Sequence, residues 1–226
     1  MKAGGTRICG LASVLALAAS GCAQQASVAD LNAAYERSIV AAAAHEKPQT
    51  HPLQPIDPAA PAVTVAHVQP YPTIDTKRFI WVARPDELQA LCRGRADALV
   101  AIQEALGLPP QARGDVKVFI FDVRPADLFR PCASSPDTGT AQCSADLPQA
   151  PDPTHADAEH FVLKQMMDSY RTGPGTQGYP FTAMGWSYNW DPAAANAQGV
   201  SEYVVRPGAM ISNVVSATPE AFCARR

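Results

Sequence analysis

The sequence predicts an α+β domain stapled by two disulfides, and four observations support that prediction. A strand–helix–strand unit opens the domain, a separate helix follows it, and a C-terminal antiparallel β region closes the chain. Four cysteines lie beyond the first 22 residues, and an even number of cysteines in an exported protein indicates disulfides. We expect this domain to span residues 73–226.

The strand–helix–strand unit covers residues 77–123. Apolar residues run almost without a break through the end of 77–82, which predicts a buried strand. Pro85 begins the helix, because proline fits the first helical turn, where its missing amide hydrogen is not needed. The apolar stripe of this helix ends at Gly107, and the segment 116–123, Val-Lys-Val-Phe-Ile-Phe-Asp-Val, is the clearest strand in the chain.

A long polar loop, residues 131–154, separates this unit from the remaining elements. The next helix is predicted over 154–171, where apolar side chains recur at helical spacing. The segments 200–205 and 210–215 are predicted to be strands joined by a Pro-Gly turn. The last third of the chain therefore forms the antiparallel β region.

The four cysteines of the domain allow three disulfide connectivities. Cys132 and Cys143 flank a short polar loop, so a bridge between them is the simplest pairing. That pairing leaves Cys92 to bond Cys223 and tie the first helix to the C-terminus. None of these cysteines has the close spacing of a structural zinc site, and no metal is predicted.

The N-terminus has the pattern of an export signal, with basic Lys2 and Arg7 before an apolar run too short to span a membrane. Small residues then lead to Cys22. A cysteine at this boundary resembles the lipobox of bacterial lipoproteins, in which cleavage before the cysteine leaves it to carry acyl chains. The resemblance implies that residues 1–21 are removed and that lipid on Cys22 anchors the protein to a membrane. The alternative is an ordinary cleaved signal.

Residues 22–72 are predicted to be a tether between that lipid and the domain. Its first residue after the cysteine is Ala23, where many inner-membrane lipoproteins have Asp, so the resemblance favours the outer membrane. The tether contains a helix at 28–46, either exposed or docking on a partner, and seven prolines in 47–72. Such a proline-rich segment is typical of extended polyproline, which would hold the domain several nanometres from the membrane.

The charge of the chain argues against several partners. Loss of the signal removes two basic side chains and leaves 16 against 21 acidic ones. No run of basic residues remains, so nucleic acid is not an expected partner. No cofactor-binding motif occurs in its required structural context, and no cofactor is predicted.

Aromatic residues gather in the C-terminal third of the chain. Alternation places Trp186, Tyr188 and Trp190 on one face of an extended segment, either as part of the core or as an exposed platform for a ligand. The surrounding segment, Tyr179-Pro-Phe-Thr-Ala-Met-Gly-Trp-Ser-Tyr-Asn-Trp, resembles one in small uncharacterised secreted proteins of bacteria and fungi. That resemblance implies no activity. The leading hypothesis is a non-catalytic binding module in the cell envelope, with an unknown ligand.

An enzyme is the alternative hypothesis. Arg171, near a helix end, and Glu202, before a V-V-x-P-G turn, resemble the mono-ADP-ribosyltransferase toxins. The resemblance implies that Arg171 anchors a nicotinamide dinucleotide and that Glu202 is the catalytic acid. His160 is a second possible partner of Glu202, as a general base, or else a partly buried structural histidine. The alternative is therefore a transferase or hydrolase that uses Glu202 with Arg171 or His160.

Overall fold

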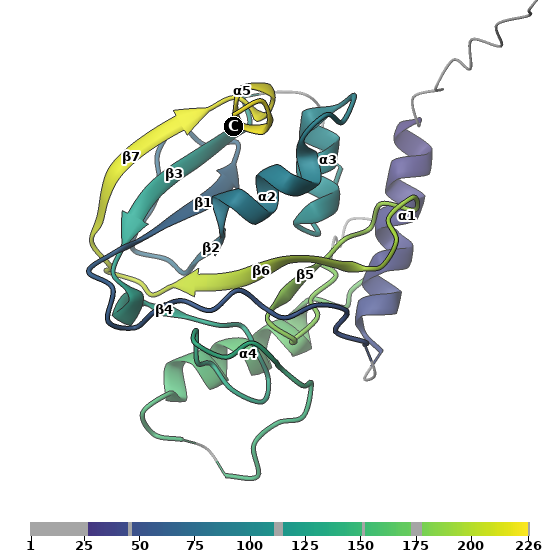
Figure 1. The fold of residues 1–226 in the computed structure, drawn as a ribbon. Coiled ribbons are helices and arrows are strands. Elements are labelled where there is room, and N and C mark those ends of the chain that lie inside the picture. The colour runs from purple at the N-terminus through teal and green to yellow at the C-terminus, as the bar shows by residue number, and fades with distance from the viewer. Residues whose placement is uncertain (1–26, 45–46, 111–114, 151, 173–177, 226) are drawn as a thin grey trace, which may run out of the picture.

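A computed structural model describes residues 27–44, 47–110, 115–150, 152–172 and 178–225. It has five α-helices and an antiparallel, curled sheet among these residues, which confirms the predicted α+β class (Figure 1). The signal peptide and Cys22 lie outside the described residues. The helices are α1 (Val28–Ala42), α2 (Pro85–Cys92), α3 (Ala98–Ala105), α4 (Ala156–Asp168) and α5 (Pro219–Cys223).

The sheet has the strand order β4-β6-β2-β1-β3-β7, and β5 pairs with the first half of β6. Every pair is antiparallel. The strands are β1 (Val63–Gln69), β2 (Ile80–Ala83), β3 (Lys117–Val123), β4 (Leu128–Phe129), β5 (Trp186–Tyr188), β6 (Gln198–Val205) and β7 (Ile211–Ala217). A short 3₁₀ turn, Pro125–Asp127, precedes β4.

The two strands expected to follow one another across a Pro-Gly turn are β6 and β7, but they do not pair with each other. β6 pairs with β2, and β7 pairs with β3. The reason is that β1 occupies the middle of the sheet, between β2 and β3. The turn between β6 and β7 therefore connects distant positions of a curled sheet.

Two groups of helices cover different parts of one sheet face (Figure 1). Helices α2, α3 and α5 pack on Val200 of β6, and helix α4 packs on Val204 of the same strand. Since side chains alternate along a strand, Val200, Glu202 and Val204 point to the same face. Glu202 therefore lies between the two covers. The opposite face forms a separate core inside the curl of the sheet, with Phe121 and Tyr203 among its buried residues.

The prediction that residues 47–72 form an extended tether is wrong, and the domain begins well before residue 73. The strand β1, which lies within this range, has seven backbone pairs with β3 in the centre of the sheet. Its sequence is compatible with a central strand because Pro61 and Pro70 stand outside it, so no ladder hydrogen bond is lost to proline. Leu53 and Ile56 are also buried in the core.

A buried arginine holds the segment before β1 in place. The side chain of Arg130 has no exposed surface, and its guanidinium donates hydrogen bonds to the carbonyl oxygens of Gln54 and Thr138, at 2.7 and 3.0 Å. The same group lies 4.7 Å from the centre of the Tyr203 ring, a cation–π contact. The proline-rich segment is therefore anchored to the domain.

Helix α1 is also part of the domain, which corrects the expectation of an exposed helix. Its narrow apolar stripe buries Tyr35 and Ile39 against Trp190. The Tyr35 hydroxyl donates a hydrogen bond to the carbonyl oxygen of Gly178, at 2.8 Å. Burial raises the pKa of this hydroxyl. The helix thus docks on its own chain.

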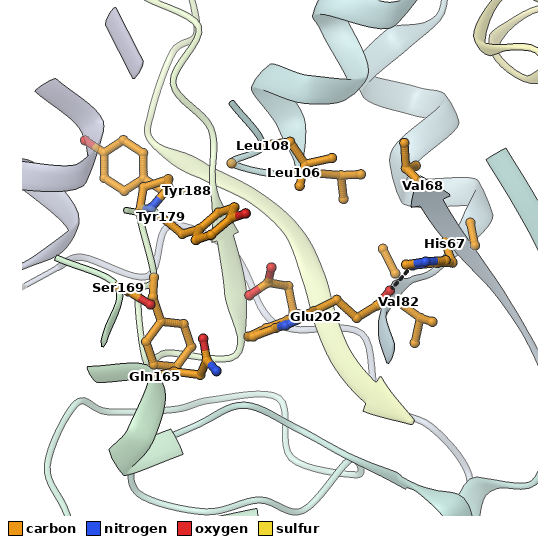
Figure 2. A pocket seen from close by; sticks show the side chains of 16 residues that line it. His67, Val68, Val82, Leu106, Leu108, Gln165, Ser169, Tyr179, Tyr188 and Glu202 are labelled. Carbon is orange, nitrogen blue, oxygen red and sulfur yellow. Dashed lines mark hydrogen bonds between the residues drawn. The ribbon is translucent and has the colours of Figure 1, made fainter. Parts of the chain in front are cut away.

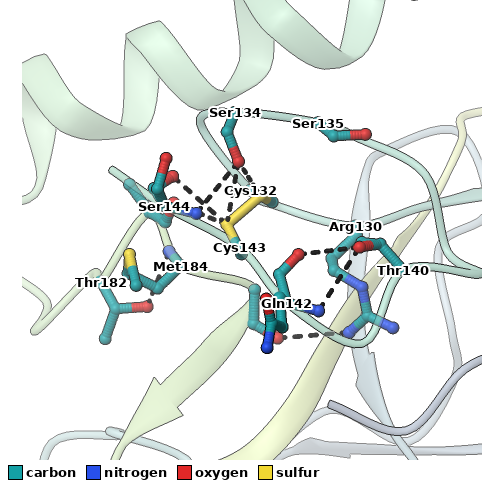
Figure 3. The surroundings of a disulfide bond; sticks show 12 residues. Arg130, Cys132, Ser134, Ser135, Thr140, Gln142, Cys143, Ser144, Thr182 and Met184 are labelled. Carbon is teal, nitrogen blue, oxygen red and sulfur yellow. Dashed lines mark hydrogen bonds between the residues drawn. A yellow bond between two sulfur atoms is a disulfide. The ribbon is translucent and has the colours of Figure 1, made fainter. Parts of the chain in front are cut away.

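Both predicted disulfides are present in the structure. Cys92 at the end of α2 bonds Cys223 in α5, across 131 residues of sequence. Cys132 bonds Cys143 and closes the start of the long polar loop (Figure 3). The backbone amide of Ser144 donates a hydrogen bond to the hydroxyl of Ser134 at 3.0 Å, so the segments that follow the two cysteines are also joined to each other.

Candidate functional site

The candidate site is a cavity of about 340 Å³ on the sheet face between the two helical covers. Figure 2 shows Glu202 in the middle of the labelled side chains that surround this space. Strands β1, β2 and β6 form its floor, and the end of α3, helix α4 and the segment 179–181 form its walls. The lining residues most relevant to its chemistry are His67, Trp81, Gln165, Tyr179, Tyr188 and Glu202.

The cavity exists because small residues lie beside Glu202 in the sheet. The register pairs Glu202 with Ala83, and Ala83 with Ala66, so these three residues form one row across β6, β2 and β1. Both alanines are buried and line the cavity. Two methyl side chains leave space above the sheet that larger residues would fill.

A partly buried histidine, His67, lies on β1 beside β2. Nδ1 of His67 lies 2.8 Å from the carbonyl oxygen of Trp81, and its Nε2 lies 3.0 Å from the amide oxygen of Gln69. Since a carbonyl oxygen can only accept, Nδ1 carries a hydrogen in this arrangement. Burial lowers the pKa of His67, against the opposing effect of these two hydrogen bonds. The Nδ1–H of the imidazole thus ties β1 to the backbone of β2.

Glu202 differs from His67: among the residues that the structure describes, no side chain or backbone group bonds its carboxyl. Part of the side chain faces the open cavity. Burial raises the pKa of Glu202 to about 8, because the surrounding protein disfavours the charged form. At neutral pH the group is therefore mostly an uncharged carboxylic acid, able to donate one hydrogen bond.

The walls of the cavity are largely aromatic. Trp81 and Phe181 meet edge to face with ring centres 5.9 Å apart, and Tyr179 and Tyr188 come from the segment before β5 and from β5 itself. Tyr179 is half exposed, which places it at the rim. Two polar side chains also line the cavity, Gln165 of helix α4 and Ser169 just after its end. The arrangement can enclose a small apolar or aromatic body and present one polar group to it.

The structure places one of the three predicted catalytic residues in this cavity. Glu202 lines it, whereas Arg171 and His160 do not. His160 is exposed on α4, and Arg171 is exposed and pairs with Asp168 at 2.7 Å. The sequence resemblance to ADP-ribosyltransferases implied an Arg–Glu pair in one site, and the structure does not bring that pair together in the cavity.

The predicted aromatic platform is also wrong for its two tryptophans. Trp186 and Trp190 are 1% and 4% exposed, so neither presents a stacking surface. Trp190 is covered by α1, and its indole N–H donates to the carbonyl oxygen of Leu108 at 3.0 Å. Tyr188 differs from them, because it reaches the cavity. Sequence reasoning gave no role to His67, Gln165 or Ser169, which carry no motif and meet only in the fold.

Among the described residues, no three His, Cys, Asp or Glu side chains gather in a way that would hold a metal ion. No helix in the same part of the chain is long and apolar enough to cross a membrane. No protein-family model matches the chain, and no curated protein and no solved structure matches it either.

Proposed function

We propose that this protein is a lipid-anchored protein of the bacterial cell envelope that binds a small molecule in the cavity around Glu202. The observation that carries the proposal is an aromatic cavity of about 340 Å³ containing a single carboxyl group without a partner in the described structure. This volume lies in the range of small-molecule sites, which are mostly apolar with a few polar groups that orient the ligand. The ligand sits in this cavity instead of on the predicted tryptophan platform.

A cavity-filling substitution tests the binding site. Leu108→Trp places a bulky ring at the wall of the cavity. We expect this variant to bind a neutral aromatic probe, 2-phenylethanol, about tenfold more weakly or worse, because the probe can no longer bury its phenyl ring in the cavity. Titration calorimetry or ligand-observed NMR measures this. Met167→Trp is the matched control, because Met167 is 83% exposed on α4 and does not line the cavity. Equal binding by both variants would place the ligand elsewhere.

An enzyme remains the second candidate, and the raised pKa of Glu202 favours it. A carboxylic acid with a pKa of about 8 in an apolar cavity suits a general acid, which must hold its proton at neutral pH. The catalytic role would belong to Glu202 without Arg171 or His160. Chemical conversion of a bound molecule, stopped by Glu202→Gln while binding persists, would favour this candidate over binding alone.

The lipid anchor is tested at the cysteine that would carry it. We expect Cys22→Ser to abolish metabolic labelling by palmitate and to release the protein from membranes, because serine cannot form the thioether of the anchor. Ala23→Ser is the matched control and retains both properties. Unchanged labelling of the Cys22 variant would refute the anchor, and with it the proposed outer-membrane location.

The docked N-terminal helix changes where an anchored domain would stand. Helix α1 begins at Val28, so only about five residues separate Cys22 from the folded domain. Even fully extended, they span about 18 Å at most. We therefore propose that the domain works close to the membrane surface, not several nanometres away.

A further inference from the structure

We propose that the ligand of this cavity is a small organic cation, an amine attached to an apolar or aromatic body. The inference rests on the proposed function, since it names the chemical class of the ligand that the cavity binds. Two independent features of the cavity support it: the aromatic walls and the carboxyl group that faces the enclosed space.

The aromatic walls provide one attraction. The faces of aromatic rings carry partial negative charge and attract ammonium groups, most strongly where water is excluded. Four aromatic residues line this cavity: Trp81, Tyr179, Phe181 and Tyr188. Several rings around one cavity are typical of sites that recognise organic cations.

The carboxyl group of Glu202, which has no cationic neighbour among the lining residues, provides the second attraction. The titratable side chains that line the cavity with Glu202 are His67 from β1, Tyr179 from the segment before β5, and Tyr188 from β5. The wall at α4 contributes Gln165 and, just after the helix, Ser169. The segment that follows α3 contributes two leucines and a glycine, so neither wall adds a charge. His67 is held between strands by its own bonds. Burial nevertheless lowers the pKa of His67 and favours its neutral form, and no Lys or Arg side chain lines the cavity. A bound amine would supply the cation that Glu202 lacks.

Binding involves a balanced proton transfer. The empty cavity holds a protonated carboxyl, because burial raises the pKa of Glu202 to about 8. When an ammonium group enters, the carboxyl O–H bond breaks, its proton passes to solvent, and the carboxylate accepts an N–H hydrogen bond from the ligand. One proton is released for each ammonium bound. A neutral ligand releases none. An anionic ligand is opposed by the loss of its hydration, because no Lys or Arg side chain lines the cavity to pair with it.

Three probes of nearly equal size test the class of ligand: 2-phenylethylamine, 2-phenylethanol and phenylacetate. We expect the amine to bind about tenfold more tightly than the alcohol at pH 7, with phenylacetate weakest. Calorimetry in two buffers of different ionisation enthalpy should report the release of nearly one proton with the amine and none with the alcohol. Glu202→Gln should remove both the preference for the amine over the alcohol and the proton release, and the variant should still bind the alcohol. Glu36→Gln, on the exposed side of α1, is the matched control.

The outcomes separate this inference from the proposed function. If the alcohol or phenylacetate binds as tightly as the amine, or if the amine releases no proton, the inference is overturned and the cavity remains a binding site. If none of the three probes binds the wild-type protein, both are overturned. A thermal melt of each variant accompanies the titrations, and the comparison of the three probes on the wild-type protein tests the inference even if Glu202→Gln does not fold.

Discussion

Replacing Glu202 with glutamine should make the protein markedly less sensitive to alkaline pH. In the folded protein the pKa of Glu202 is about 8, whereas its value in an unfolded chain is near 4.5. Between these values the unfolded chain has lost a proton that the folded protein keeps. Between these two pH values, ionisation of this group therefore lowers the free energy of unfolding of the wild type by about 1.4 kcal/mol per pH unit. The total loss is about 4–5 kcal/mol above pH 8.

The measurement is the difference between the two proteins, followed by urea unfolding from pH 4 to pH 9. Below about pH 4.5 the carboxyl is protonated in both the folded and the unfolded state and contributes no pH dependence. The difference in stability between the two proteins at low pH therefore measures only the pH-independent effect of the substitution. Glu36→Gln, an exposed substitution of the same chemistry, should run parallel to the wild type. A constant difference between wild type and Glu202→Gln across the whole range would contradict the raised pKa.

Removal of the Cys92–Cys223 disulfide should cost more stability than removal of the Cys132–Cys143 disulfide. The first closes a loop of 131 residues and the second a loop of 11. Restricting a longer loop lowers the entropy of the unfolded chain more, which gives about 5 kcal/mol against about 3 kcal/mol. The paired changes Cys92→Ala with Cys223→Ala, and Cys132→Ala with Cys143→Ala, measure the two contributions by chemical denaturation.

Alanine suits this comparison because Cys92 and Cys223 lie in an apolar core between α2, α3 and α5, where a serine hydroxyl would add a buried polar group. Wild type unfolded under reducing conditions is the reference for the loss of both bridges. An equal or larger loss from the Cys132–Cys143 pair would show that native contacts of the polar loop outweigh loop length.

The parts of the fold that the sequence predicted are those with a local signal. The strand 116–123 is marked by its valine, isoleucine and phenylalanine residues, Pro85 marks the first residue of α2, and the disulfide pairing follows from the short loop between Cys132 and Cys143. Local patterns also predicted Glu202 as a functional residue, although as a catalytic acid acting with Arg171 or His160. Each of these depends on residues close together in the chain.

The parts that it missed depend on distant contacts. Strand β1 was hidden because seven prolines dominate the composition of 47–72, although none of them lies within the strand. The burial of Trp190 depends on α1, more than 140 residues away in the sequence. The cavity depends on Ala66 and Ala83 lying beside Glu202, which is a property of strand register and leaves no trace in a local pattern.

The strand order also determines when the domain can fold during synthesis. The three central strands, β2, β1 and β3, come from the first part of the chain, whereas β6, β7 and α5 come from residues 198–223. Until those last residues emerge, the central strands have unpaired edges on both sides, and such edges invite pairing with other chains. The finished sheet therefore forms in a late step, and a chain truncated before residue 198 should remain unfolded and prone to aggregate.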